Sequence, residues 1–206
     1  MIPQTDGSIL QYLRLTAKPD PQFEARLALA VHRQSTAPGF IASMEGAVMA
    51  AAQTWVALVI WADEASAHAS TESWFNSDYH ADFKAQVVSV DENRIMRAPP
   101  GVFEAIHGSR YARFLWLEQF RVPADSDWEP YLARRMTDFY ARPGFNEAFP
   151  FLSTSAALSR GIVSTWDDAL QVRQAAEEIH AREQLIDQEL SSDTFVRISS
   201  SNSAAV

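Results

Sequence analysis

The 206-residue chain contains no cysteine, which excludes disulfides, thiolate nucleophiles and cysteine-ligated metals from its chemistry and leaves the redox compartment open. Positive charge is also scarce, because 17 lysines and arginines stand against 26 aspartates and glutamates, giving a net charge of −9. A protein that binds nucleic acid by neutralising phosphates needs the opposite balance. No nucleic-acid partner is therefore expected.

Long apolar runs are missing as well. The longest are interrupted by polar residues well before the roughly 20 residues that a membrane span requires, so no membrane segment is expected. Residues 1–6 lack the basic stretch followed by an apolar core that is typical of a signal peptide. With 47% hydrophobic residues, enough for a sizeable core, we expect a cytoplasmic globular protein.

Several catalytic and ligand-binding motifs are absent too. There is no glycine-rich phosphate loop, no Gly-x-Ser-x-Gly turn and no dinucleotide fingerprint, so nucleotide-binding and serine-hydrolase functions lack support. The five histidines are widely separated and show none of the spacings of metal ligands, so no metal is expected. They are His32, His68, His80, His107 and His180.

What the sequence does contain is a repeated set of landmarks. Pro38-Gly39-Phe40 recurs as Pro143-Gly144-Phe145, and Trp61 recurs as Trp166, all at one offset of 105 residues. Agreement of several landmarks on one offset predicts that the chain contains one domain twice. In both places Pro-Gly-Phe lies between a helical pattern and a strand pattern, where proline ends the helix and glycine supplies the turn.

Periodicity and capping residues predict the same order of elements, βαββαβ, in each copy. The first copy is expected to contain strand 9–16, helix 20–34, strands 40–50 and 54–61, a helix from 63 that continues with a break to 88, and strand 102–107. The second copy is expected to contain strand 114–122, helix 125–140, strands 145–152 and 161–166, a long helix from 167, and strand 195–199.

Such a unit places two helices on one face of a four-stranded antiparallel sheet and leaves the other face uncovered. The predicted fold is therefore α+β, with two ferredoxin-like βαββαβ repeats packed sheet against sheet as an intrachain pseudo-dimeric α+β barrel. The expected boundaries are 1–108 and 109–199, followed by a disordered tail over 200–206. A homo-oligomer of this unit is compatible with the sequence.

Three segments of the first copy resemble the antibiotic biosynthesis monooxygenase (ABM) domains of the dimeric α+β barrel superfamily. They are Pro38-Gly39-Phe40-Ile41-Ala42-Ser43, Ile60-Trp61-Ala62-Asp63-Glu64 and Trp74-Phe75-Asn76-Ser77-Asp78. The second copy keeps Pro143-Gly144-Phe145 and Thr165-Trp166-Asp167-Asp168. The resemblance implies a cleft between sheet and helices in each unit, where some members oxidise polycyclic phenols or quinols with molecular oxygen and no cofactor.

Individual positions of the family pattern are matched unevenly. The tryptophan that ends the third strand of the oxygenases is matched by Trp61 and Trp166, whereas the asparagine that precedes it is replaced by Ala57 and Ile162. A related haem-degrading branch is matched poorly, because its strand asparagine and its iron-ligating histidine fall at Leu13 and Lys84. The resemblance thus implies a protein without a cofactor.

Glu118 is the most suggestive candidate catalytic residue. It alternates with Trp116 and Phe120 on one face of a predicted strand. Loss of hydration among aromatic neighbours would raise the pKa of its carboxyl and suit it to act as a general base toward a phenol or an activated C–H group. The alternative is a structural role, in which Glu118 pairs with an arginine such as Arg14 or Arg121, or lies exposed at a strand edge.

Four tryptophans are the expected substrate-binding residues, because flat apolar rings with indole N–H groups suit an aromatic ligand. They are Trp61, Trp74, Trp116 and Trp166. Core packing is the alternative role of each. His180 is the second candidate catalytic residue, as a proton shuttle facing the second cleft, since the reference pKa of histidine lies near neutrality. Surface exposure is its alternative.

Two functions follow from these patterns. One is a cofactor-independent monooxygenase acting on an aromatic phenol or quinol, and the other is a noncatalytic aromatic-ligand-binding or structural pseudo-dimer. The expected partner in both is a small aromatic molecule. The unequal halves favour one working cleft, and the patterns disagree on which, since Glu118 indicates the second copy and the Trp74 segment the first.

Overall fold

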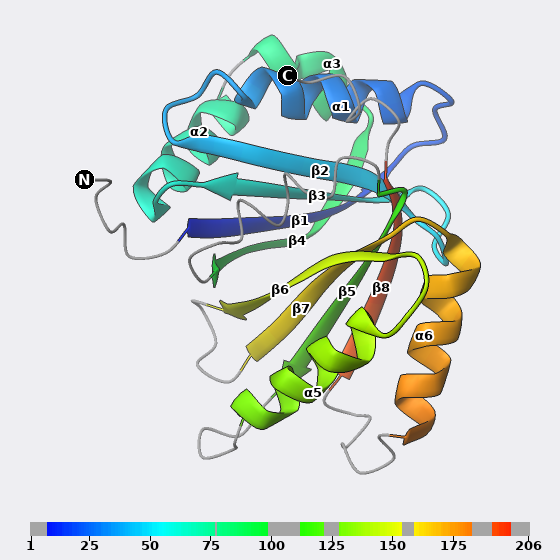
Figure 1. The fold of residues 1–206 in the computed structure, drawn as a ribbon. Coiled ribbons are helices and arrows are strands. Elements are labelled where there is room, and N and C mark those ends of the chain that lie inside the picture. Colours follow the sequence, from blue (N-terminus) through cyan, green and yellow to red (C-terminus); the bar gives the residue numbers. More distant parts are fainter. Residues whose placement is uncertain are drawn as a thin grey trace.

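A computed structural model describes residues 8–76, 78–98, 112–121, 128–153, 159–182 and 191–198 (Figure 1). Strands and helices alternate along the chain in two similar series. In order they are β1 (Ser8–Ala17), α1 (Phe23–Gln34), β2 (Phe40–Val48), β3 (Thr54–Trp61), α2 (Glu64–Asn76), a 3-10 helix (Asp78–His80), α3 (Ala81–Lys84), β4 (Val87–Ala98), β5 (Phe114–Arg121), α5 (Trp128–Tyr140), β6 (Phe145–Ser153), β7 (Ser159–Trp166), α6 (Ala169–Arg182) and β8 (Ser191–Ile198).

The start of α1 shows how local sequence sets an element boundary. The helix begins at Phe23, three residues after the predicted start, and the Asp20 carboxylate lies just before it. That carboxylate accepts hydrogen bonds from the Gln22 backbone N–H (2.8 Å) and from Nε of Arg26 (3.0 Å), so it fixes the turn that leads into the helix. Phe23 and Leu27 then open the buried stripe that packs on the first sheet.

Two glycines explain why Pro-Gly-Phe occurs twice. Gly39 and Gly144 have φ values of 78° and 72°, in the left-handed region that residues with a Cβ avoid. Each also lies against a helix, because a Cβ at Gly39 would collide with Ser66 on α2 and one at Gly144 with Gln171 on α6. The motif therefore turns the chain from one helix into the next strand while keeping the following helix close.

The eight strands form a closed antiparallel barrel in the order β1-β3-β2-β8-β5-β7-β6-β4. Each series contributes four neighbouring strands, and two short seams join the resulting sheets. In one seam β2 pairs with β8, from Gly46 opposite Ile198 to Val48 opposite Val196. In the other β4 pairs with β6, with Met96 opposite Ser153 and Arg97 opposite Leu152. The predicted α+β class and sheet-against-sheet packing are thus confirmed as an eight-stranded antiparallel barrel.

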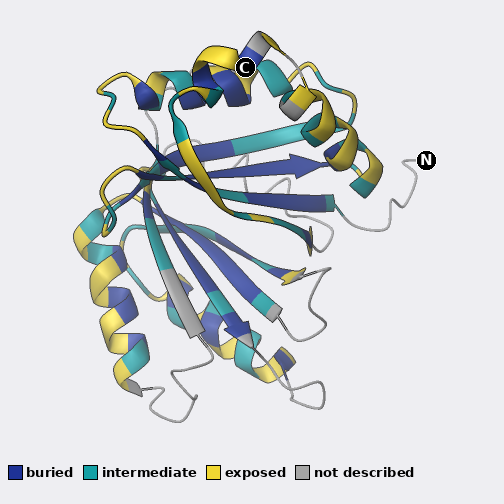
Figure 2. Cartoon of the chain, turned by 180° about the vertical axis from the view of Figure 1, so that it is seen from behind, coloured by how far each residue is buried: buried dark blue, intermediate teal, exposed yellow. Residues whose placement is uncertain are grey.

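The helices cover the outer faces of the barrel (Figure 1). Helices α1, α2 and α3 lie over the sheet of β1 to β4, whereas α5 and α6 lie beside the sheet of β5 to β8. Strand alternation separates two sets of side chains. Inward residues such as Tyr12, Leu58, Leu117 and Val163 form the core between the sheets, while outward residues pack under the helices, whose far faces are exposed (Figure 2).

The fourth strand lies earlier than the sequence predicted. Helical structure ends at Lys84, and β4 already begins at Val87 and pairs antiparallel with β1. Its first part carries polar residues such as Asp91, whose carboxylate accepts a hydrogen bond from Thr16 on β1 (2.8 Å), so apolar alternation could not reveal it. The strand predicted over 102–107 and the tail predicted over 200–206 fall outside the described residues. None of the described helices combines the length and the apolar composition needed to cross a membrane.

Candidate functional site

The first sheet and its helices enclose a small cavity between β1, β3 and β4 on one side and α1, α2 and α3 on the other. Its volume is about 30 Å³, which is enough to hold water but far below that of a site for a drug-sized ligand. Leu13, Leu27, Val31, Val59 and Phe83 give it mainly apolar walls. In this conformation the cavity is therefore apolar and too small for an aromatic ring system.

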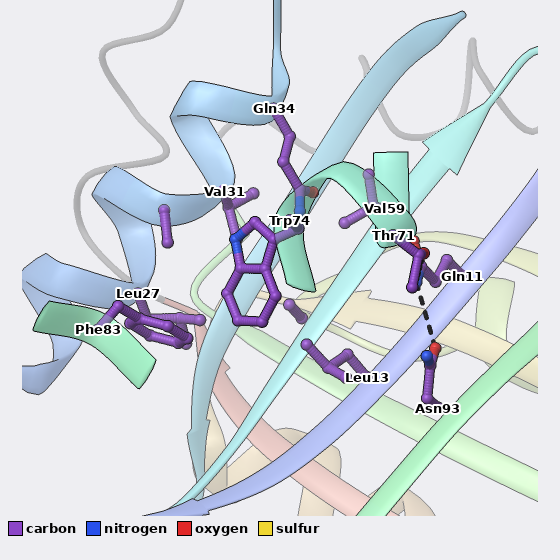
Figure 3. A pocket seen from close by; sticks show the side chains of 12 residues that line it. Gln11, Leu13, Leu27, Val31, Gln34, Val59, Thr71, Trp74, Phe83 and Asn93 are labelled. Atoms are coloured by element: carbon purple, nitrogen blue, oxygen red, sulfur yellow. Dashed lines mark hydrogen bonds between the residues drawn. The ribbon is translucent and has the colours of Figure 1, made fainter. Parts of the chain in front are cut away.

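A hydrogen-bonded cluster forms the polar end of this cavity (Figure 3). Nε2 of Gln11 donates to Oγ1 of Thr71 (3.0 Å) and to Oδ1 of Asn93 (3.2 Å), and its Oε1 accepts from the indole N–H of Trp61 (3.1 Å). The hydroxyl of Thr71 donates in turn to the carbonyl of Ala67 (2.8 Å). Every hydrogen-bonding atom of the Gln11 amide is used, so the cluster holds its orientation and that of Trp61.

The cavity lining carries amides, a hydroxyl and an indole but no titratable side chain among the described residues. Such groups can orient a polar edge of a ligand, and none can exchange a proton with it near neutral pH. The cavity thus offers binding and orientation rather than acid–base chemistry. Across the described part of the chain, no group of three or more acidic or histidine side chains could hold a metal ion.

Trp74 separates this cavity from a larger open groove on the protein surface. Its ring lies 5.3 Å from that of Phe83, inside the cavity wall, and 5.3 Å from that of His80, in the groove. Trp74 and Gln34 line both spaces, and the groove has a volume of about 630 Å³. Figure 3 shows the indole between Val31 and Leu13. A rotation of the Trp74 side chain is therefore the smallest movement that would join the two spaces.

His80 is the titratable side chain beside Trp74. It is only 8% exposed, and burial lowers the pKa of its imidazole below the ordinary value, with further lowering by the positive charges of Arg33 and Lys84. The neutral form of the His80 imidazole is therefore favoured over the protonated form. The sequence analysis placed no role on it.

Glu118 lies in the second half and is part of a buried ion pair. Its Oε1 is 3.1 Å from Nη2 of Arg135 on α5, and both side chains are 1% exposed. The sequence analysis had named Arg14 and Arg121 as possible partners. Arg14 lies instead 3.7 Å from Glu92, and the Arg121 side chain is outside the described ones. If Glu118 has a structural role, its partner is thus Arg135 on α5 and neither of the two arginines named from the sequence.

Aromatic rings surround the Arg135 guanidinium. Its central carbon is 5.9 Å from the ring of Trp116, 5.3 Å from that of Tyr131 and 5.9 Å from that of Phe139, and Nη2 also donates a hydrogen bond to the Tyr131 hydroxyl. Cation–π contacts of this kind are strongest when they are desolvated. The guanidinium and its cage occupy the space between the second sheet and α5.

The four predicted tryptophans fall into different environments. Trp61, Trp116 and Trp166 are fully buried, whereas Trp74 is partly exposed and lines the cavity and the groove. Nε1 of Trp166 donates to Oγ of Ser164 (2.9 Å), and the edge of Trp116 lies against His180 with ring centroids 5.9 Å apart. Trp116, Trp166, Glu118 and His180 thus gather in the second half, and Trp61 and Trp74 in the first.

The sequence analysis missed Gln11, Thr71, Asn93 and Arg135. Gln11 left a weak signal, as an isolated polar residue in the buried part of β1. Arg135 left a clearer one, because it interrupts the helical stripe that Trp128, Tyr131 and Phe139 form on α5. Thr71 and Asn93 left none, since their proximity to Gln11 depends on how α2 and β4 pack around β1.

No protein-family model matches this chain, and no curated protein matches it either. Solved structures do match. A proposed monooxygenase of Fusobacterium nucleatum subsp. nucleatum has a TM-score of 0.64 at 11% identity, over 94% of this chain and 93% of that chain. An anthrone oxidase-like protein has a TM-score of 0.63 at 11% identity, over 94% and 92%.

A third match is a W145F variant of the chlorite dismutase of Candidatus Nitrospira defluvii, in complex with cyanide. Its TM-score is 0.64 at 7% identity, over 96% of this chain and 93% of that chain. Identities this low show a shared fold and leave the chemistry open, as the different activities in these names illustrate. The resemblance seen in the sequence is confirmed at the level of the fold: this chain shares its overall fold with these three proteins.

Proposed function

We propose that this protein is a cofactor-independent monooxygenase for an aromatic phenol or quinol, and that its working cleft is in the first half. One observation carries the proposal, namely the apolar cavity that ends in the Gln11 cluster and adjoins the groove across Trp74. An aromatic ring system suits the apolar walls, and its oxygen substituents suit the amides and the hydroxyl. Substrate entry then requires Trp74 to move, since a cavity of about 30 Å³ is too small for an aromatic ring system.

The chemistry proposed for this cleft needs only deprotonation and oxygen. A phenol or an activated CH₂ group loses a proton, and the electron-rich anion reacts with O₂. In the oxidation of a ring CH₂ to a carbonyl, one oxygen atom enters the ring carbon and the other leaves as water. His80 is the proposed proton acceptor for a substrate that spans cavity and groove, because it lines the groove beside Trp74 and its lowered pKa favours the neutral form. The Gln11 amide orients the oxygen substituent.

A second proposed location is the cluster of Glu118, His180, Trp116 and Trp166 that the sequence pattern indicated. Glu118 would be its general base and His180 its proton shuttle. The buried Arg135 beside Glu118 weighs against this location, because the space above the carboxylate already holds a guanidinium and three aromatic rings. Unchanged turnover by Glu118→Gln would exclude it.

We also propose that the two halves are copies of one ABM-like unit, residues 1–108 and 109–199. The equal offset of the element starts supports this: β2 and β6, β3 and β7, α1 and α5, and α2 and α6 each begin 105 residues apart. Strand register agrees, since Leu13 lies opposite Ala57 and Glu118 lies opposite Ile162. Both pairs sit at the same offset.

Oxygen uptake by chelator-treated protein tests the proposed activity, with a panel of anthrones, naphthohydroquinones and related phenols, corrected for spontaneous oxidation. Saturable uptake is expected. Thr71→Val should then lower kcat/KM about tenfold or more, because it removes a hydroxyl from the polar end of the cavity. Thr137→Val is the matched control: both hydroxyls donate to the carbonyl four residues earlier, but Thr137 is exposed.

The alternative is a noncatalytic aromatic-binding or structural pseudo-dimer. It is favoured by the cavity lining, whose described residues carry no acid or base, and by the filled space of the second half. Aromatic ligands that quench tryptophan fluorescence without any oxygen uptake above background would support this alternative. A loss of uptake in Thr137→Val equal to that in Thr71→Val would remove the first-half cavity from the proposed mechanism.

A further inference from the structure

The open groove beside Trp74 differs in composition from the rest of this acidic protein. It lies between α2 and the end of α1, and no aspartate or glutamate is among the described residues that line it. The whole chain has 26 acidic residues against 17 lysines and arginines, so a groove of this size whose described lining carries no acidic side chain is distinctive. Arg33 contributes a positive charge to one wall.

Two further observations describe the electrostatics of the groove. The wall opposite Arg33 carries the hydroxyl groups of Ser66, Ser70 and Ser73 from α2, which can donate hydrogen bonds to an anion. Burial lowers the pKa of His80 most, and the positive charges of Arg33 and Lys84 lower it further, so two cations act on this imidazole at the edge of the groove. Cationic charge, hydroxyl donors and the absence of carboxylates among the described lining residues together favour an anionic ligand.

Size and shape narrow the ligand further. About 630 Å³ is within the range of small-molecule sites, and the Trp74 ring offers one flat apolar surface. Alanines alternate with the serines on the α2 wall, at Ala65 and Ala69, so a planar ring can approach the helix closely. A molecule that combines a flat ring with one negative charge fits both features.

We propose that the groove between α1 and α2 is a binding site for an aromatic carboxylate, with the carboxylate at Arg33 and the serine hydroxyls and the ring against Trp74. This site would extend the proposed function, because a substrate held in the groove by its carboxylate has its ring at the entrance to the cavity. Only the choice of an aromatic ligand rests on the proposed function. Binding itself requires no turnover.

Matched probes test the charge directly: 2-naphthoate is anionic at pH 7.5, and 2-naphthamide has the same ring without the charge. Titration calorimetry should give a Kd at least about tenfold lower for 2-naphthoate, as expected for one charge-assisted hydrogen bond. Arg33→Gln should abolish this preference. Arg173→Gln, which removes an exposed positive charge from α6 in the second half, should retain it. Trp74→Phe should lose most of the fluorescence quenching caused by 2-naphthoate.

Three outcomes would overturn the proposal: equal affinity for the two probes, no binding of either, or a preference for 2-naphthoate that survives Arg33→Gln. Circular dichroism of each variant confirms that it is folded. Oxygen uptake is measured separately. If 2-naphthoate binds through Arg33 but no panel compound supports oxygen uptake, the groove site is supported and the proposed oxygenase activity is refuted. If neutral phenols support oxygen uptake but the two probes bind equally well, the activity is supported and the groove site is refuted.

Discussion

Replacing Glu118 by Gln should destabilise the protein strongly. The change keeps the shape of the side chain and removes the negative charge 3.1 Å from Arg135, which is 1% exposed. Breaking a buried pair by removing one charge costs about 3–5 kcal/mol, because the remaining charge stays desolvated. The aromatic cage around the guanidinium is present before and after the change, so it does not offset the loss. For a chain of this size the expected fall in Tm is roughly 6–20 °C.

Urea unfolding followed by circular dichroism measures this loss. Glu24→Gln serves as control, since it removes the acid from a more exposed pair with Arg197 (2.9 Å) and should cost less than about 1 kcal/mol. The double variant Glu118→Leu with Arg135→Met replaces the pair by apolar side chains and should unfold within about 1 kcal/mol of the wild type. Glu118→Gln would refute this reasoning if it lowered the free energy of unfolding by less than about 1 kcal/mol. The double variant would also refute it if its loss equalled the sum of the losses in Glu118→Leu and Arg135→Met.

Three other predictions concern single residues. Burial, with a smaller contribution from Glu92, raises the pKa of Tyr12 to about 12. Because the folded state then holds the phenolic proton more tightly than the unfolded state, the free energy of unfolding should fall by roughly 2–3 kcal/mol between pH 10 and 12. Tyr12→Phe should flatten this part of the pH profile. Gln11→Leu should cost about 1–3 kcal/mol in a urea titration, because it leaves the indole N–H of Trp61 buried without its acceptor. Gly46→Ala should lower Tm, because its Cβ would collide with the backbone of β8 at the seam, and an unchanged Tm would show that the seam can open.

Much of the fold could be predicted from local sequence, because local chemistry decides it. Pro-Gly-Phe fixed the starts of β2 and β6 through the left-handed glycines, and Asp63 correctly indicated the start of α2, where its carboxylate accepts from the Ser66 backbone N–H (2.7 Å) and the pKa of Asp63 is lowered by that bond. β4 was misplaced because its partner lies about 80 residues earlier, and pairing with β1 outweighs the weak apolar pattern of its own residues.

The candidate site was harder to predict than the fold, because it depends on which side chains meet across elements. Tryptophan content alone could not separate Trp74, which lines a cavity, from Trp116, which is fully buried. The expectation that Glu118 lies among aromatic side chains agrees with its place on β5, but its position relative to Arg135 follows from the docking of α5 on the sheet. Sequence periodicity indicates which face of a strand or helix a residue occupies. It does not indicate which side chains of other elements pack against that face.

The cavity of the first half is lined by small side chains at positions where the second half, at the same offset of 105 residues, has larger ones. Small side chains line it at Ala30 on α1 and Ala57 on β3, and the residues at the same offset in the second half are Arg135 and Ile162. The Arg135 guanidinium lies among aromatic rings, and Glu118 supplies the counter-charge that makes a buried arginine tolerable there, whereas the first half has Leu13 at that offset. A ligand site is therefore expected in the first half, where the small side chains of Ala30 and Ala57 line the cavity.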